Sequence, residues 1–284
     1  MTNSPRRRLD RVLVERGLVE SRPQAVALID EGQVLVSGSV AEKPSRLVAA
    51  AEPVELLGPP PRFVGRGGEK LDAALHRFSI DVSGLRALDA GASTGGFTDC
   101  LLQAGAASVV AVDVGRGQLH PRLRSDPRVE CRERLDIRDV TLETVGGTPV
   151  GLVTADLSFM SVTRAVAVLT GEVVAPDSPL VVLVKPQFEA GRVEASRGKG
   201  VIRDPEVHRR TLAEVAGALA GAGADVLGVM PSPITGSAGN TEFLLHARTP
   251  PAGRPAADPS TTVAGLTDLV DRAVTEAHGE KATG

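Results

Sequence analysis

Lys185 ends an apolar run, at a place in the chain where a side chain could take part in proton transfer. The run at 179–184 reads PLVVLV, and Pro186 follows the lysine. Such a run is typical of a strand with both faces covered, and open α/β sheets bind ligands at the carboxyl ends of their strands. The chain has 27 arginines but five lysines, and arginine does not lose its proton in proteins. Lys185 is therefore a candidate base; the alternative is a lysine that extends from a strand edge to solvent.

Three further charged residues are expected at the same edge of the sheet. Asp156 ends a predicted strand, Glu242 begins the last predicted strand, and Lys70 lies in the helix before the first strand. Desolvation and a nearby like charge lower the pKa of a lysine, whereas carboxylates hold its position and partly oppose that shift. A neutral lysine could accept a proton from a hydroxyl group. The pattern fits such a titrating unit and a structural network of ion pairs equally well.

Small residues follow the first predicted strand, in the segment LDAGASTGGFTD at 88–99. They allow a ligand to approach the backbone closely, and a helix is expected to begin near Thr94. The segment lacks the GxGxxG spacing of dinucleotide-binding loops and the lysine of a P-loop, and a purely structural turn fits it as well. The residues expected to contact a cofactor are Gly91, Ala92, Ser93, Thr94, Gly95, Gly96 and Phe97.

Two aspartates indicate the kind of cofactor. Asp113 ends the second predicted strand about 20 residues after the loop, where a carboxylate binds a ribose diol. Asp136 follows the third predicted strand and is placed to contact an adenine amino group, with the cap of a helix as its alternative role. The loop has no phosphate-binding lysine, so the pattern predicts a nucleoside cofactor without phosphates. S-adenosylmethionine is such a cofactor.

These residues depend on an alternation of strands and helices that begins at Glu69. We expect helices at 69–79, 94–104, 161–171 and 205–222, and strands at 86–90, 108–113, 128–131, 151–156, 180–185, 224–230 and 241–247. This order predicts an α/β fold, a Rossmann-like, mostly parallel sheet with helices on both faces. The loop PSPITGSAGN at 231–240 leaves no room for a helix, so the last strand should be antiparallel.

The ends of the chain differ from this pattern. We expect residues 6–57 to form a small α+β module. It should contain two helices, the second capped by Ser21, and a hairpin with a Ser-Gly turn. The proline- and glycine-rich segment 58–68 is expected to be a linker, and 69–248 the larger domain. In the tail at 249–284 we expect a mobile spacer at 249–263 and a short amphipathic helix at 264–278.

The composition limits the classes of function. The 284 residues include no Trp or Tyr and six Phe, with a net charge of −3, so nucleic-acid binding would depend on local arginine clusters and not on stacking. The two cysteines, Cys100 and Cys131, indicate neither a disulfide framework nor a metal site. No signal peptide and no apolar run of about 20 residues is present, so we expect a soluble, cytoplasmic protein.

Several motifs resemble the TlyA family of 2′-O-ribose methyltransferases of ribosomal RNA, over about residues 6–247. They are DAGASTGGFTD, ADLSFMS, LVKPQFEAGR and SPITGSAGNTEF. The segment RLDRVLVERGLVESRPQAVALIDEGQVLVSG resembles an S4 RNA-binding domain, and FVGRGGEKL resembles the family's VSRGG-x-KL stretch. Gly65 replaces the usual serine of that stretch, so a role for the serine hydroxyl does not carry over to this chain.

The resemblance implies an FtsJ-like methyltransferase domain that uses S-adenosylmethionine and modifies cytidine ribose within ribosomal subunits, with no metal. It implies a catalytic tetrad at Lys70, Asp156, Lys185 and Glu242, in agreement with the positions derived above. The longer family members, which the N-terminal extension and the tail resemble, modify the rRNA of both subunits. The side chains expected to bind rRNA phosphates are Arg6, Arg7, Arg8, Arg11, Arg22, Arg62 and Arg66.

Two other functions are open at this point. The family's older haemolysin label suggests a pore-forming cytolysin, although the sequence has no membrane-length segment and no aromatic belt. A protein that binds rRNA or ribosomes without catalysis is the other alternative. Consumption of the methyl donor with purified RNA separates the enzyme from this inactive binder.

Overall fold

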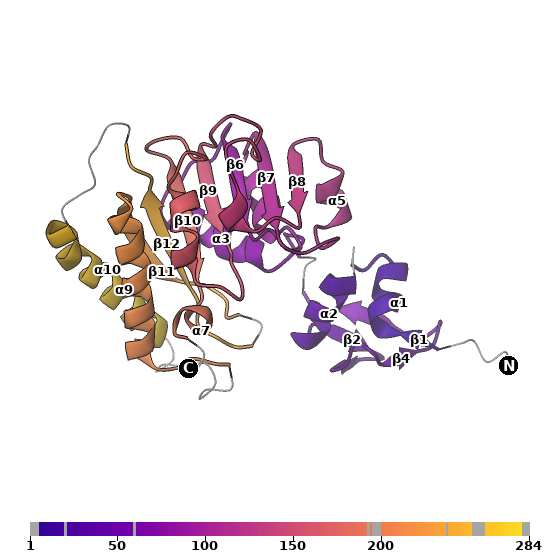
Figure 1. Cartoon of the computed structure of the whole chain (residues 1–284). Helices are drawn as coiled ribbons and strands as arrows, with labels where there is room; N and C mark the ends of the chain where they lie inside the picture. The colour runs from indigo at the N-terminus through magenta and orange to yellow at the C-terminus, as the bar shows by residue number, and fades with distance from the viewer. Residues whose placement is uncertain are drawn as a thin grey trace. The chain divides into compact units, whose positions relative to one another are not determined.

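The computed structural model describes residues 6–19, 22–58, 61–191, 194, 200–236, 238–251 and 259–279. The chain divides after Gly65 into a smaller N-terminal unit and a larger unit (Figure 1). Each unit has a hydrophobic core of its own.

The N-terminal unit combines two helices with five short strands. In chain order these are β1 (Arg7–Arg8), α1 (Leu9–Glu15), α2 (Arg22–Asp30), β2 (Val34–Val36), β3 (Ser39–Val40), β4 (Leu47–Val48) and β5 (Val54–Leu56). The two predicted helices are confirmed, as is the hairpin of β2 and β3 around the turn Ser37–Gly38. The pairs β1–β4 and β2–β5 were not predicted, because strands of two or three residues are too short to show a period of two. The predicted cap Ser21 lies outside the described residues.

The larger unit alternates helices and strands as the sequence predicts. Its elements are α3 (Gly67–Arg77), β6 (Arg86–Ala90), α4 (Gly96–Gln103), β7 (Ser108–Asp113), α5 (Pro121–Arg124), β8 (Val129–Glu133), η1 (Ile137–Asp139), β9 (Leu152–Ala155), η2 (Val162–Arg164), α6 (Val166–Leu169), β10 (Pro179–Val184), α7 (Pro186–Glu189), α9 (Pro205–Gly221), β11 (Asp225–Pro231), β12 (Phe243–Arg248) and α10 (Pro259–Gly279).

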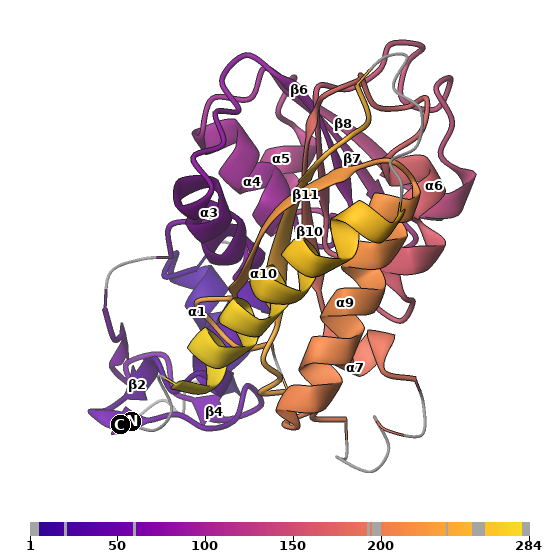
Figure 2. The same ribbon diagram turned by 90° about the vertical axis from the view of Figure 1, so that its left-hand side faces the viewer.

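Seven strands form one sheet in the order β11-β12-β10-β9-β6-β7-β8. The neighbours from β10 to β8 are parallel, and β12 is antiparallel to both β10 and β11, so the predicted last strand is confirmed. Figure 2 shows α3 and α4 on one side of this sheet and α6 and α9 on the other. The central strands are therefore covered on both faces, which explains why β10 is an unbroken apolar run.

The order of the strands reverses between β6 and β9. From β6 the chain continues to β7 and β8 on one side, and from β9 to β10 on the other. Open α/β sheets bind ligands at such a switch point, beyond the carboxyl ends of the strands. Gly91 and Asp156 directly follow these two strands. A Cβ added to Gly91, whose φ is +85°, would lie 2.5 Å from the Asp156 carbonyl oxygen, so only glycine allows this approach.

Three predicted elements differ from the structure, and the short elements α5, η1 and α7 were not predicted. The expected helix at 161–171 is divided into η2 and α6, because Ser161 caps a 3₁₀ turn and the segment is rich in β-branched residues, which lose side-chain freedom in a helix. Helix α3 begins at Gly67, within the expected linker, because its first turn packs against Phe97 of α4. The expected spacer at 249–263 is wrong at both ends, since Thr249 is buried and hydrogen-bonded to Ser178 and α10 begins at Pro259.

Helix α10 belongs to the fold of the larger unit. It lies along α9 and β11 (Figure 2). Its buried residues Val270, Ala273, Val274 and Ala277 recur at helical spacing and join the main core, as expected for the amphipathic helix predicted there.

Candidate active site

Two lysine–carboxylate pairs lie beyond the carboxyl ends of the strands. The Nζ atom of Lys70 is 2.5 Å from Oε2 of Glu242, and the Nζ atom of Lys185 is 2.5 Å from Oδ1 of Asp156. The side chains of Lys70, Lys185 and Glu242 are at most 10% exposed, and that of Asp156 is 23% exposed. Buried charges of this kind interact strongly, because water screens them little.

The sheet register and α3 bring the two pairs together. Val184 of β10 is paired with Phe243 of β12. Lys185 directly follows Val184 and Glu242 directly precedes Phe243, so both lie at the same edge of the sheet. The Gln187 side-chain amide donates to Glu242 Oε1 at 3.4 Å and links α7 to the second pair. On α3, one turn before Lys70, a Cβ added to Gly67 would lie 3.8 Å from Asp156 Oδ2. The four residues predicted as a tetrad thus gather at one place, and their catalytic roles remain a prediction.

Two polar residues at this place were missed by sequence reasoning. The Lys185 Nζ atom donates a hydrogen bond of 2.8 Å to Ser158 Oγ, and Gln187 contacts Glu242 as described. Both lie in motifs that were recognised, ADLSFMS and LVKPQFEAGR. Each lies within two residues of a charged residue at the end of a strand, and this closeness was the only sign of their role. A single serine or glutamine does not form a periodic pattern that would identify it.

A fully buried carboxyl lies behind the site, on β6. Asp89 accepts a hydrogen bond of 2.6 Å from Thr98 Oγ1 and one of 3.4 Å from Thr154 Oγ1, which joins β6 to α4 and β9. Burial raises the pKa of Asp89 to about 7; the charge of Asp156 adds to this rise, and the threonine hydrogen bonds oppose it. The group therefore titrates near neutral pH in the folded protein.

Asp89 makes the stability of the protein depend on pH. Because its pKa is raised on folding, the folded state binds an extra proton between the unfolded and folded pKa values, and stability falls as pH rises through about 7. Relative to Asp89→Asn, the free energy of unfolding of the parent should fall by about 3 kcal/mol between about pH 5 and about pH 8. Urea unfolding of both proteins at the two pH values measures this change; a constant difference between them would contradict it.

A cavity of about 210 Å³ lies beside the Lys185–Asp156 pair. Its walls come from the loops after β6, β7, β8 and β9. They comprise Gly91, Ser93, Val112, Asp113, Val114, Gln118, Leu135, Asp136, Ile137, Asp156, Leu157, Ser158, Phe159 and Met160. Among these described residues there is no lysine or arginine, so the walls combine carboxylates and hydroxyls with apolar side chains. This set suits a nucleoside with a cationic centre and does not suit phosphates.

The Asp113 carboxylate is held in place by backbone amides. Its Oδ2 accepts from the Ser93 N–H at 2.8 Å and its Oδ1 from the Gly115 N–H at 2.6 Å. These bonds join the end of β7 to the loop after β6. Each oxygen keeps a further lone pair for a ribose hydroxyl of S-adenosylmethionine, and the residues present fit that group.

Asp136 has the capping role that the sequence offered as an alternative, and its contact with an adenine stays a prediction. It accepts from the backbone N–H of Arg138 at 2.9 Å and so caps η1, and it also lines the cavity. The Arg138 guanidinium, hydrogen-bonded to this carboxylate, lowers the pKa of Asp136 to about 2. Asp136 is therefore an ionised acceptor at the wall of the cavity.

The predicted cofactor loop lines the cavity only in part. Ala92, Thr94, Gly95, Gly96 and Phe97 are not among its lining residues. Gly95 has a φ of +98°, and a Cβ there would collide with the side chains of Leu119 and Leu123. Gly91 and Ser93 of this loop line the cavity, and contact of the other loop residues with the cofactor stays a prediction.

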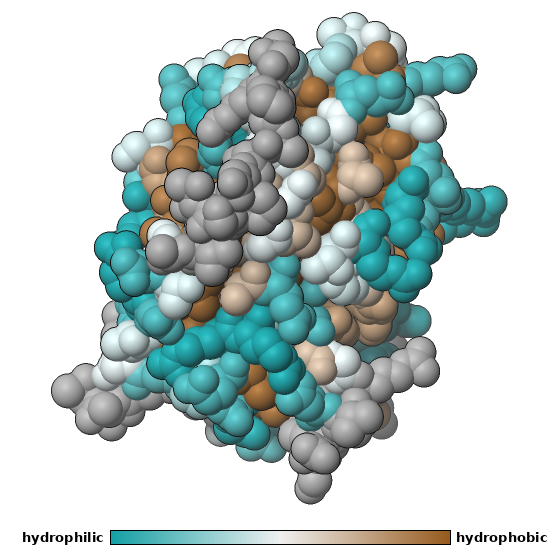
Figure 3. Space-filling model, turned by 60° about the vertical axis from the view of Figure 1, so that its left-hand side comes forward, coloured by the Kyte–Doolittle hydropathy of each residue, from teal (hydrophilic) through white to brown (hydrophobic). Residues whose placement is uncertain are grey.

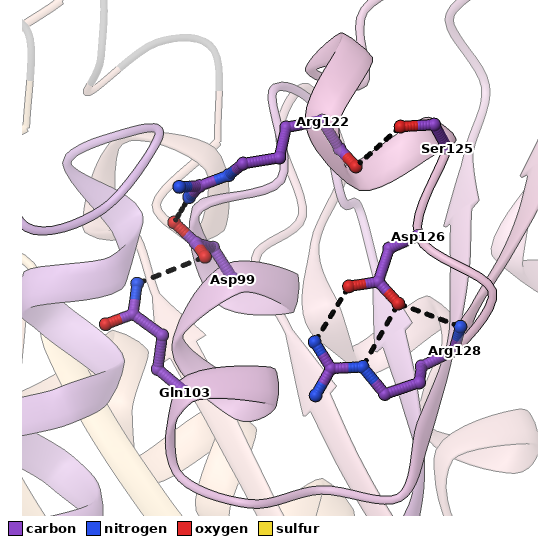
Figure 4. Close-up of polar contacts among 6 residues, drawn as sticks. All are labelled: Asp99, Gln103, Arg122, Ser125, Asp126 and Arg128. Carbon is purple, nitrogen blue, oxygen red and sulfur yellow. Dashed lines mark hydrogen bonds and ion pairs between the residues drawn. The ribbon is translucent and has the colours of Figure 1, made fainter.

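Polar contacts fix the helices that follow the loop (Figure 4). Asp99 on α4 accepts from Arg122 of α5 at 2.9 Å and from Gln103 at 3.1 Å, and Asp126 pairs with Arg128. These residues line a hollow of about 490 Å³. Of these contacts, the one between Asp99 and Arg122 joins α4 to α5.

The N-terminal unit carries the predicted arginine cluster. Arg6, Arg7, Arg8 and Arg11 line a hollow of about 480 Å³ together with Glu15 and Leu47. Arg7 forms an ion pair with Glu15, and both Arg8 and Arg22 form ion pairs with the buried Asp10. The Arg8 hydrogen bond lowers the pKa of Asp10 to about 2, against the effect of burial. These intramolecular pairs orient the guanidinium groups without neutralising the cluster.

The remaining two predicted arginines have local contacts. The Arg62 guanidinium lies 4.6 Å from the ring centroid of Phe63, a cation–π contact. Arg66 donates a hydrogen bond of 2.6 Å to the Thr235 carbonyl, in the loop that leads to Glu242. Arg66 therefore also supports the loop of the second lysine–carboxylate pair.

No helix in the described part of the chain is long and apolar enough to cross a membrane. On the face drawn in Figure 3, apolar side chains lie in patches interrupted by hydrophilic ones. Among the described residues, no group of three or more His, Cys, Asp or Glu is arranged to hold a metal ion.

Comparison with known proteins gives consistent matches over both units. The model of FtsJ-like methyltransferases matches residues 63–249, and that of the S4 domain matches residues 7–53. The chain is 44% identical over 272 residues to the 16S/23S rRNA (cytidine-2'-O)-methyltransferase TlyA of Mycobacterium tuberculosis, which covers 95% of this chain and 98% of that protein. It is 36% identical over 239 residues to Hemolysin A of Brachyspira hyodysenteriae, over 84% of this chain and 98% of that protein. A solved Streptococcus thermophilus structure, described under the name hemolysin, has a TM-score of 0.74 at 34% identity and covers 98% of this chain and 99% of its own.

Proposed function

The chain belongs to the TlyA family of FtsJ-like methyltransferases, and on this premise we propose that it methylates the ribose 2′-hydroxyl of cytidine in ribosomal RNA. S-adenosylmethionine supplies the activated methyl group when bound. The related protein of M. tuberculosis is named for 16S and 23S rRNA, so we propose both as substrates. The observation that supports the proposal best is the gathering of two buried lysine–carboxylate pairs beside a cavity that suits a nucleoside.

Lys185 is the proposed base of the reaction. S-adenosylmethionine, held by Asp113 and Asp136, would supply the methyl group, and the Lys185 Nζ atom would take the proton of the 2′-hydroxyl as that oxygen is methylated. Asp156 and Ser158 hold this amine at 2.5 and 2.8 Å. Since the attack must be in line, orientation of the ribose should account for much of the acceleration.

The second pair, Lys70 and Glu242, is proposed to position the ribose and to adjust the electrostatic environment of the Lys185 amine. Lys70 and Glu242 are held against each other at 2.5 Å, with Gln187 as a third partner. Phe159 is 91% exposed at the rim of the cavity and lies 5.4 Å from the Phe188 ring, so it offers a face for the target base.

Asp113 is proposed to bind the cofactor ribose, and Asp113→Ala should weaken S-adenosylmethionine binding. A lost hydrogen bond to a charged group costs about 1.5–3 kcal/mol, so affinity measured by calorimetry should fall at least about tenfold. Asp126→Ala, which removes a hydrogen-bonded aspartate outside the cavity, is the matched control. Equal affinities of parent and Asp113→Ala would remove Asp113 from the cofactor site.

The N-terminal unit is proposed to bind rRNA through phosphates and shape. Its arginines are clustered and supported by Asp10 and Glu15, and the unit matches the S4 domain. Ribosomal subunits are then the partner, and the cytoplasm the place of action. We propose the domain limits 6–57 for this unit, 58–68 for the linker, 69–248 for the methyltransferase domain and 249–284 for the tail.

The test is methyl transfer in vitro. Purified protein, labelled S-adenosylmethionine and unmodified ribosomal subunits should give label in 2′-O-methylcytidine after nuclease digestion. Binding of rRNA without consumption of the methyl donor would support the inactive binder instead. Lysis of red cells by the purified protein, in the absence of methyl transfer, would support a cytolysin.

A further inference from the structure

Several contacts join the loop at 157–162 to Lys185 and to helix α7, which follows it. Lys185 donates to Ser158, the Phe188 ring lies 5.4 Å from the Phe159 ring, and Glu189 contacts Ser161 and Val162. The loop directly follows Asp156 and forms one wall of the cavity. Its position therefore affects both the amine of Lys185 and the shape of the site.

Of these residues, Glu189 makes two hydrogen bonds to the loop. Its Oε2 accepts from Ser161 Oγ at 2.5 Å and its Oε1 from the Val162 backbone N–H at 2.9 Å. Burial raises the pKa of Glu189, and the two hydrogen bonds oppose the rise. One carboxylate thus fixes both a side chain and the backbone where the loop ends and η2 begins.

Both ends of the loop are buried in the core, through Leu157 and Val162, whereas its middle at Phe159 is not. Phe159 has a φ of +66°, in the left-handed region that non-glycine residues rarely adopt, and its ring is 91% exposed. A strained and exposed residue keeps its conformation only where its surroundings impose it. At one end the loop is fixed by β9, and at the other end, where Ser161 also bonds to Thr163, Glu189 bonds to Ser161 and Val162.

We propose that Glu189 is a positioning residue that holds the loop 157–162 against α7, so that Ser158 orients the Lys185 amine and Phe159 stays at the rim of the cavity. This inference rests on the proposed function for its activity readout. It assigns no contact between Glu189 and the substrate. A displacement of about 1 Å in such a site can lower a rate by about 100-fold, so loss of the anchor should be visible in the rate of transfer.

Glu189→Ala tests the proposal in single-turnover methyl transfer with rRNA and S-adenosylmethionine at saturation. We expect a rate about 30- to 100-fold lower, with the unfolding transition and cofactor affinity showing that the variant is folded. Glu189→Gln should restore most of the rate, because its amide oxygen accepts from the Val162 N–H and its NH₂ group donates to Ser161 Oγ. Glu214→Ala removes a neighbouring carboxylate whose charge acts on Glu189 without bonding to the loop, and it should retain the parent rate.

A spectroscopic readout tests the loop without activity. The chain has no tryptophan, so Phe159→Trp introduces one reporter at the rim. Its fluorescence anisotropy should fall when Glu189→Ala is added and should be kept with Glu189→Gln. If Glu189→Ala does not fold, Ser161→Ala, which removes one of the two bonds, should give a smaller loss of rate and of anisotropy.

The outcomes separate this inference from the proposed function. Absence of transfer by the parent would overturn the proposed function, while the anisotropy would still decide on the anchor. A parent-like rate of folded Glu189→Ala would overturn the inference, and so would unchanged anisotropy in a folded, slow variant. Lower rate and anisotropy together, both restored by glutamine, would support it.

Discussion

Lys185→Arg should lose methyl transfer almost completely while it still binds S-adenosylmethionine. Arginine keeps the positive charge beside Asp156 but cannot accept a proton from the ribose hydroxyl. General base catalysis contributes about 10²–10⁴-fold, so we expect the single-turnover rate to fall about 10³-fold. The Lys185 side chain is only 10% exposed, so the site has little room for the larger guanidinium group of arginine. The hydrogen bond that the lysine amine donates to Ser158 is therefore also lost.

The control for this variant is Lys43→Arg, the same exchange at an exposed lysine of the N-terminal unit. It should keep the parent rate, and calorimetry should give similar cofactor affinities for all three proteins. Transfer by Lys185→Arg within a few-fold of the parent would mean that Lys185 only orients the hydroxyl.

Removal of residues 1–57 should abolish rRNA modification and leave the methyltransferase fold intact. The seven-stranded sheet, its core and the cavity beside Lys185 are all formed by residues beyond Arg66. The arginine cluster, in contrast, lies wholly in the removed unit, and neutralised phosphates dominate the affinity of proteins for nucleic acids. We expect transfer to rRNA to fall at least about 100-fold at subsaturating RNA, since several phosphate contacts are lost together.

Circular dichroism and calorimetry with S-adenosylmethionine provide the control for the truncated protein, which should keep a cooperative transition and parent-like cofactor affinity. A parent-like rate of rRNA modification by this protein would instead place recognition on the larger unit. Arg62 and Arg66, which remain after the truncation, would then be the first candidates.

Much of the larger unit could be predicted because its strands carry a strong signal. The strands at 86–90 and 108–113 were predicted with the bounds that the structure has, since the first leads into a loop of small residues and the second is an apolar run that ends in Asp113. The antiparallel last strand followed from a loop too short for a crossover helix. Parallel strands end at one edge of a sheet, so the gathering of Lys70, Asp156, Lys185 and Glu242 could also be predicted.

The pairing within that group could not be predicted. Lys70 contacts Glu242 across 172 residues of chain, and only the packing of α3 beside β12 decides this partner. Ser158 and Glu189 were missed for a related reason, because each acts through one contact between two loops and leaves no periodic pattern. The elevated pKa of Asp89 likewise follows from complete burial, which the sequence of one strand does not reveal.

The central claim is tested most directly by mapping 2′-O-methyl groups on the rRNA of cells with and without this protein. Cells that lack it should lose methylation at specific cytidines of the 16S and 23S rRNA, the substrates named for the related M. tuberculosis protein. The parent gene should restore these groups, and Lys185→Arg, expressed at the same level, should not. Identical methylation maps in all of these cells, or restoration by Lys185→Arg, would contradict the account.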